Sequence, residues 1–169
     1  MKQSKVFSPL AIILNFFTSK GESETFVSES GWFKFDKPKE WIYEREDKDT
    51  YSFHNESDWK GSLRISPYRF TGAETEVQIE KVDQYVNDEL NEQEDAKRIS
   101  LGDKEVVFYS KIIDSEEDVL QIDYLVFGIE NTLFLCSFTI DNKEVNDLKV
   151  KKGITLYRRA LESLLLNDQ

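Results

Sequence analysis

The stretch VLQIDYLVFGIENTLFLCSFTI, at residues 119–140, decides the fold. Two runs rich in β-branched and aromatic residues flank a short break at residues 128–131, and this pattern predicts a β-hairpin. Both runs are apolar on both faces. In the first run, one face carries Leu125, Phe127 and Ile129, and the other carries Leu120, Ile122, Tyr124 and Val126. In the second run, one face carries Phe134, Cys136, Phe138 and Ile140, and the other carries Leu133 and Leu135. Such strands need cover on both faces, so we expect the hairpin to lie inside an antiparallel sheet and not at its edge.

The composition is that of one acidic domain. A chain of 169 residues can bury a core without disulfides, and its 12 phenylalanines suit a sheet covered by large rings. The formal net charge of -11 repels nucleic-acid backbones and anionic lipid, so it argues against binding to DNA, RNA or a membrane surface and favours a basic protein partner. The single cysteine, Cys136, excludes an internal disulfide, and its place within a strand predicts a small buried hydrophobe.

Residues 1–23 form an N-terminal extension with the outline of a signal peptide. Lys2 and Lys5 precede an apolar stretch at residues 6–17 that is too short to span a bilayer as a helix. Ser8, Pro9 and Asn15 interrupt this stretch. Two interpretations therefore stay open: a retained extension on a cytoplasmic protein, which we favour, and an export signal removed near Glu22. In either case residues 24–169 are expected to form a single α+β domain.

Short aromatic strands are predicted between residues 26 and 70. Alternation is clearest at residues 51–54 and 61–66, where Leu63 and Ile65 should point inward and Ser62, Arg64 and Ser66 outward. Pro67 should end the ladder of the second strand or place it at an edge.

Three segments of this region carry a resemblance: GWFKFDKPKEW at 31–41, YSFHN at 51–55 and GSLRISPY at 61–68. They resemble the opening of an uncharacterised bacterial family of small domains of unknown function. More distantly, the chain is similar to the PsbP-like fold of photosystem PsbP proteins, Ran-binding Mog proteins, periplasmic DcrB-type proteins and chaperones that load type VI secretion effectors. The resemblance implies an α+β domain in which a central acidic helix and a C-terminal helix flank an antiparallel meander. It carries over no catalytic residue, metal site or nucleotide site, because members of that fold act mainly by binding.

The central helix is predicted from its start and its apolar stripe. Thr75-Glu76-Val77-Gln78 has the form of a capping box with Thr75 as N-cap, and Val82, Tyr85, Val86 and Leu90 repeat on one face. Residues 74–95 contain nine acidic residues and one base, Lys81. This run is either a solvated face or a docking face for a basic partner.

The C-terminal region begins with Asp141-Asn142, which can cap a short helical turn. Gly153 should break that turn, after which Ile154, Tyr157, Leu161, Leu164 and Leu165 form a helical stripe. Six basic residues lie between residues 143 and 159, so the charge of the chain is uneven. The acidic helix and this basic segment either complement each other or join two copies of the chain.

Few residues suggest chemistry. His54 is the only histidine, and it is expected at the surface or at a sheet edge. Asp123 comes nearest to a carboxylate with apolar neighbours, but Gln121 shares its face and predicts an outward or partly wet position. The sequence has no glycine-rich phosphate loop and no Cys/His spacing for a metal. We therefore expect no cofactor, no metal and no enzymatic activity.

Binding candidates are large aromatic, arginine and acidic side chains of the types that dominate protein interfaces. They are Trp59, Arg64, Tyr68 and Arg69, with Glu80 and Asp83 on the acidic helix. The favoured function is a bacterial non-enzymatic protein-binding domain: an adaptor, an effector chaperone or an immunity-type protein. The alternative is an exported PsbP-like domain that binds a small ligand or an envelope component. The partner and the oligomeric state are not defined by the sequence.

Overall fold

The computed structural model describes residues 22–72, 74–114 and 118–167. The signal-like segment lies almost wholly outside these residues, and Ser23 already belongs to the first strand. The strands are β1 (Ser23–Val27), β2 (Phe33–Pro38), β3 (Trp41–Arg45), β4 (Tyr51–Asn55), β5 (Ser62–Arg69), β6 (Lys97–Leu101), β7 (Lys104–Asp114), β8 (Val119–Ile129), β9 (Thr132–Asp141) and β10 (Leu165–Leu166). The helices are α1 (Thr75–Glu92), the short 3-10 helix η1 (Asn142–Glu144) and α2 (Leu148–Glu162).

The predicted hairpin is formed by β8 and β9, which a two-residue turn at Glu130-Asn131 joins. Glu130 adopts a positive φ of 52° in this turn. The hairpin lies inside a seven-stranded antiparallel sheet of order β3-β4-β5-β9-β8-β7-β6. The prediction of an α+β fold built on a central hairpin is therefore confirmed.

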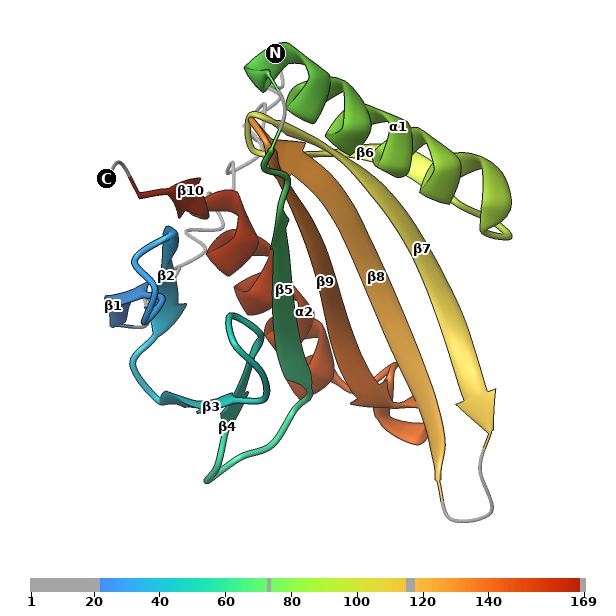
Figure 1. Cartoon of the computed structure of the whole chain (residues 1–169). Helices are drawn as coiled ribbons and strands as arrows, with labels where there is room; N and C mark the ends of the chain where they lie inside the picture. The colour runs from blue at the N-terminus through green and yellow to red at the C-terminus, as the bar shows by residue number, and fades with distance from the viewer. Residues whose placement is uncertain (1–21, 73, 115–117, 168–169) are drawn as a thin grey trace, which may run out of the picture.

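Helices cover both faces of this sheet, as Figure 1 shows, and a hydrophobic core lies on each face. On one face, α2 and a small sheet of order β1-β2-β10 bury the larger core, which contains Leu125, Phe127, Phe134, Cys136, Phe138 and Ile140 of the hairpin. On the other face, α1 crosses one end of the sheet and buries a smaller core around Val82, Val86, Val107, Val126 and Leu133. The alternation read from residues 119–140 placed these side chains on their observed faces.

Strand β5 differs from its prediction at Ser66 and accommodates Pro67 at a free edge. Leu63 and Ile65 are fully buried, as expected, but Ser66 is also buried and not exposed, because it pairs with Leu135 on the face that α1 covers. Pro67 does not end the strand. It pairs with Phe134 of β9 on one side, while the ladder to β4 stops at Ile65, so β5 has a free edge where the proline lies.

Helix α1 differs from its prediction at two points. Its N-cap is Glu74 and not Thr75, and the Glu74 side chain makes no capping hydrogen bond. Val82 and Val86 are buried, whereas Tyr85 is 42% exposed, because the sheet contacts only a narrow strip of the helix. Gly128 of β8 permits this close packing, since a Cβ atom there would lie 2.4 Å from Val82 Cγ1.

Helix α2 also departs from the predicted pattern. Asp141 caps η1 as expected, with its side chain accepting a hydrogen bond from Lys143 N. Gly153 lies inside α2 and does not break it. A glycine suits this position because the helix approaches the Lys60 carbonyl closely, and a Cβ atom would lie 3.1 Å from that oxygen. Leu165 is not part of the helix but of strand β10, where it is 50% exposed.

Candidate functional site

The α1-side face of the large sheet is only partly covered, because α1 packs over one end of it (Figure 1). Beyond the helix, two rows of side chains cross β4, β5, β9 and β8 in register. We call these two rows the open face: Ser52, Arg64, Ser137 and Tyr124 in the first row, and His54, Ser62, Thr139 and Ile122 in the second. Arg64 is exposed and the other seven are half-buried.

At its α1 end, the first row contains Tyr124, which pairs with a second tyrosine on the next strand. Tyr109 of β7 pairs with Tyr124 of β8, and their rings stack with centroids 4.8 Å apart. The Tyr109 hydroxyl donates a 2.8 Å hydrogen bond to Glu89 of α1. Burial, then this hydrogen bond and the Glu89 charge, raise the pKa of Tyr109 well above its ordinary value. The phenol thus stays protonated, and its hydrogen bond holds the C-terminal half of α1 against the sheet beside the open face.

A small cavity of about 160 Å³ lies at this junction, lined by Arg64, Glu89, Tyr109, Tyr124, Val126, Leu135, Cys136 and Ser137. Arg64 forms an ion pair with Glu46, with 2.6 Å between Nε and Oε2. Lys111 lies over both tyrosine rings, 5.4 Å from the Tyr109 centroid and 5.8 Å from that of Tyr124. The open face therefore joins aromatic rings and guanidinium and ammonium groups, which suits it to contacts with another protein.

The structure brings three of the six predicted binding residues together. Arg64 and Tyr68 lie on the same face of β5, and Trp59 in the preceding loop donates a 3.1 Å hydrogen bond from its Nε1 to Ser62 Oγ. Arg69 lies on the opposite face, with its guanidinium 5.2 Å from the centre of the Trp32 ring.

Glu80 and Asp83 lie apart from the open face. Asp83 lines a cavity with Arg98 of β6 and Gly128, and Asn87, one turn later, accepts a hydrogen bond from Arg98. Glu89 instead faces Arg64 and Tyr109. Helical spacing therefore puts Tyr85 and Glu92 on the side of α1 next to the open face, and Asp83 on the far side.

Asp123 is buried, which corrects the expectation of an outward or partly wet side chain. It is 3% exposed and lies on the α2 face of the sheet, where three donors surround it. Ser110 Oγ and Gln121 Nε2 donate to Oδ1 at 2.6 and 2.9 Å, and Tyr157 Oη donates to Oδ2 at 3.3 Å. Sequence spacing correctly placed Gln121 on the same face, but Gln121 binds this carboxylate and does not indicate solvent.

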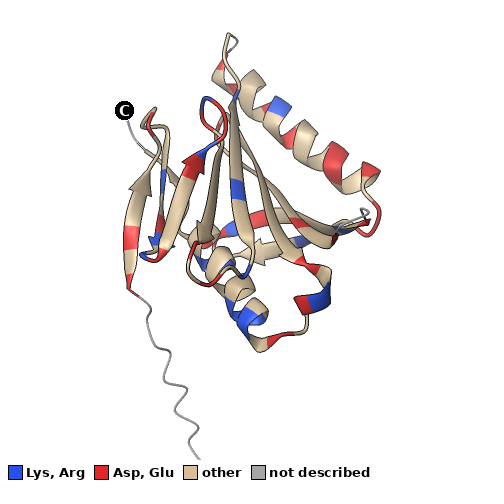
Figure 2. Cartoon of the chain, turned by 90° about the horizontal axis from the view of Figure 1, so that it is seen from below, with Lys and Arg blue, Asp and Glu red and all other residues tan. Residues whose placement is uncertain are grey.

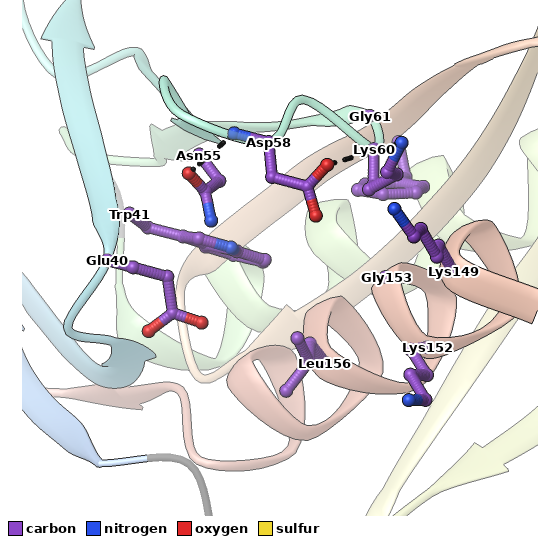
Figure 3. A pocket seen from close by; sticks show the side chains of 11 residues that line it. Glu40, Trp41, Asn55, Asp58, Lys60, Gly61, Lys149, Lys152, Gly153 and Leu156 are labelled. Carbon is purple, nitrogen blue, oxygen red and sulfur yellow. Dashed lines mark hydrogen bonds and ion pairs between the residues drawn. The ribbon is translucent and has the colours of Figure 1, made fainter.

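A second site lies between α2 and the loop from β4 to β5, on the α2 side of the large sheet (Figure 3). It is a pocket of about 290 Å³ with Trp41, Phe138 and Leu156 as apolar walls. Its other lining residues are Glu40, Asn55, Asp58, Lys60, Gly61, Lys149, Lys152 and Gly153. The sequence showed the basic segment that supplies Lys149 and Lys152 but gave no sign that it faces Trp41. Sequence reasoning therefore missed this pocket.

Two negative observations apply to the described residues. No described helix has the length and apolar character needed to cross a bilayer. Among the same residues, His, Cys, Asp and Glu side chains form no group that would hold a metal ion.

Comparison with known proteins identifies a family of unknown function and solved structures of similar fold. A family model described as "Domain of unknown function (DUF3805)" matches residues 21–157. A crystal structure from Bacteroides thetaiotaomicron VPI-5482 aligns with a TM-score of 0.64 and 18% identity, covering 86% of this chain and 49% of that one. The chain thus spans about half the length of that protein. No curated protein sequence matches the chain.

Two Mog1 structures align over almost their whole length. The Saccharomyces cerevisiae Ran-binding protein Mog1p aligns with a TM-score of 0.52 and 14% identity, covering 87% of this chain and 96% of that one. A Mog1 point variant aligns with a TM-score of 0.54 and 12% identity, covering 88% and 97%. At these identities the likeness shows the fold, and it confirms the Mog-type fold that the sequence resemblance implied.

Proposed function

The chain belongs to the DUF3805 family of domains of unknown function, and from this premise and its Mog1-like fold we propose that it is a non-enzymatic domain that binds another protein through the open face. One observation carries the proposal. Two in-register rows of the large sheet lie beyond α1, and the residues around them are of the types that provide interface hot spots: Trp59, Arg64, Tyr109 and Tyr124. An adaptor, an effector chaperone or an immunity-type protein would use such a surface.

The reactive side chains of the described residues support binding over catalysis. Complete burial raises the pKa of the Cys136 thiol far above neutral, so the thiolate that a nucleophile requires is not formed. The Tyr109 and Tyr157 phenols are likewise held protonated by burial. His54 is half-buried in β4 between Ile42 and Ser62. The Ser62 hydroxyl accepts a hydrogen bond from Trp59 Nε1, and among the described residues no hydrogen bond joins it to His54, so the pair lacks the contact by which a histidine activates a serine nucleophile.

The charge of α1 favours a basic partner. Glu89 is bonded to Tyr109, and the other acidic residues of the helix form no ion pair within the described part of the chain. Figure 2 shows these acids along α1, while lysines and arginines mark α2. A basic protein that covers the open face would bring its charges next to Glu92 and Asp88, and desolvating the contact would strengthen the attraction.

The test places a photo-crosslinking amino acid at Thr139 or Ile122 of the open face in the native host, with Leu148 as the control position. Leu148 lies on α2 and is 76% exposed. We expect one protein to be crosslinked from both open-face positions and not from Leu148. Crosslinking from Leu148 alone would exclude the open face.

The purified partner then tests the charge argument. Its dissociation constant should rise about tenfold or more between 50 and 500 mM salt, because salt screens exposed charges within about 10 Å at 0.1 M. Asp88→Lys and Glu92→Lys, each as a single variant, should weaken binding further, whereas the same charge change at Glu144 of η1 should not. An affinity that is independent of salt would contradict a basic partner.

The second candidate function is an exported PsbP-like domain that binds a small ligand or an envelope component, and the α2 pocket supports the small-ligand part of it. We propose a cytoplasmic location, with export as the alternative. Mass spectrometry of the chain from its host distinguishes the two, because a mature N-terminus near Glu22 indicates export and a retained Met1 indicates the cytoplasm.

A further inference from the structure

We propose that the pocket between α2 and the β4–β5 loop binds an organic anion, with a carboxylate or phosphate head and a flat apolar body. This site is separate from the open face. Its lining includes Lys60, Lys149 and Lys152, against two carboxylates, Glu40 and Asp58. The pocket is therefore locally basic in a chain whose net charge is -11.

The lysines are not equally available. Lys60 is paired with Asp58, with 3.3 Å between Nζ and Oδ1, so these two charges balance. The ammonium groups of Lys149 and Lys152 have no partner among the described residues. Figure 3 shows Lys149 and Glu40 at opposite ends of the pocket. The lysine end is thus open to an anion.

A fixed amide adds a directed donor. Asn55 Oδ1 accepts hydrogen bonds from Ser57 N at 2.9 Å and Asp58 N at 3.1 Å, which settles which end of the amide is oxygen. The Asn55 Nδ2 group has no partner among the described residues, and Figure 3 shows it pointing toward the Trp41 ring. A carboxylate or phosphate oxygen is the acceptor that this amide and the lysines share.

The apolar part of the ligand follows from the walls. Trp41 is 7% exposed and Phe138 is 1% exposed, and both rings border the pocket together with Leu156. Gly61 and Gly153 also line it, and neither can carry a side chain without a close contact: a Cβ atom would lie 2.4 Å from Phe138 Cζ at Gly61 and 3.1 Å from the Lys60 carbonyl at Gly153. The glycines keep the backbone close to the rings, and a flat body fits against them.

The test is an NMR titration of the full chain, followed at the indole N–H of Trp41 and the backbone amides of Asn55, Gly61 and Gly153. The probes share one ring and differ in their head: phenyl phosphate, benzoate, benzyl alcohol and benzylammonium, with inorganic phosphate as the head alone. We expect the two ring-bearing anions to bind at least about tenfold more tightly than benzyl alcohol, because charge-assisted hydrogen bonds are the stronger ones. They should also bind more tightly than inorganic phosphate.

Matched variants assign the effect to the pocket. Lys149→Gln with Lys152→Gln should weaken phenyl phosphate about fivefold or more, whereas Lys143→Gln with Lys151→Gln removes the same charge from the same segment outside the pocket and should change the affinity less than twofold. The proposal is overturned if benzyl alcohol or benzylammonium binds as tightly as the anions, if inorganic phosphate alone matches phenyl phosphate, or if both double variants behave alike. Crosslinking at the open face is independent of all these outcomes.

Discussion

Tyr157 of α2 donates a hydrogen bond across the core to the carboxylate of Asp123 in β8, with 3.3 Å between Oη and Oδ2. Ser110 and Gln121 donate to the other carboxylate oxygen. This polar group lies inside an otherwise apolar layer, so its partners are needed to satisfy a buried carboxylate. The contact fixes the position of α2 over the sheet.

Removing the Tyr157 hydroxyl should therefore destabilise the protein in a way that depends on pH. Burial, then the Asp123 charge, raise the pKa of Tyr157 from 10.0 to about 12. Tyr157→Phe should cost about 1–3 kcal/mol at pH 8. In the wild type, the raised pKa contributes to the free energy of unfolding in full below pH 10. This contribution falls by about 1.4 kcal/mol per pH unit as the pH rises from 10 toward 12. The variant has no hydroxyl to titrate and therefore lacks this fall. Urea denaturation at pH 8, 10 and 11 should show the gap narrowing above pH 10, and a constant gap would contradict the assignment.

Phe138 of the central hairpin should be among the most sensitive core positions. Its ring stacks on Tyr157 with 4.2 Å between centroids, and it is 1% exposed. Phe138→Ala should cost about 3–5 kcal/mol, a large part of the roughly 5–15 kcal/mol expected for a domain. Leu148→Ala is the control because Leu148 is 76% exposed, and it should change the stability by less than about 0.5 kcal/mol. Chemical denaturation that shows under about 1 kcal/mol of loss for Phe138→Ala would mean that this ring does not hold α2.

Helix α1 should depend on the contact between Gly128 and Val82. A Cβ atom at Gly128 would overlap Val82 Cγ1, and the branched valine cannot rotate away freely. Gly128→Ala should cost about 1–3 kcal/mol by overpacking, and Val82→Ala should be destabilising through the lost methyl groups. In the double variant the alanines fit each other, so its loss should be smaller than the sum of the single losses by about 1 kcal/mol or more. Additive losses in denaturant unfolding would show that the two residues do not touch.

The sequence predicted the sheet well because its signal is local. Alternate residues of a strand point to opposite faces, so the pattern at residues 119–140 alone assigned Phe134 and Leu133 to different cores. The same reasoning failed at Asp123, because its donors Ser110 and Tyr157 come from other elements. A polar residue within a strand is predicted to face solvent unless the partners that would satisfy it inside the core are known.

Both candidate binding sites depend on contacts that no local pattern reports. Arg64 meets Tyr124 across β9 only because of the register of three strands. The pocket joins Trp41 to Lys149, which lie on separate elements far apart in the chain. Gly153 was expected to break a helix, since glycine has a low helix propensity, but the close approach to Lys60 decides its role. Tertiary contacts overrode the propensity there.

The last prediction concerns the N-terminus of α1, where the N-cap residue makes no side-chain capping hydrogen bond. Glu74 occupies the N-cap position with extended backbone angles, φ -61° and ψ 149°, and its side chain caps no N–H group. An aspartate there has the same charge and a shorter side chain, which reaches the free N–H groups of the first turn. Glu74→Asp should therefore stabilise the protein by about 0.5–1 kcal/mol in chemical denaturation. Thr75→Ala is the control: because Thr75 is the first helical residue and not the cap, its loss should change the stability by less than about 0.5 kcal/mol. A loss of 1 kcal/mol or more from Thr75→Ala, with no gain from Glu74→Asp, would restore Thr75 as the N-cap that the sequence first indicated.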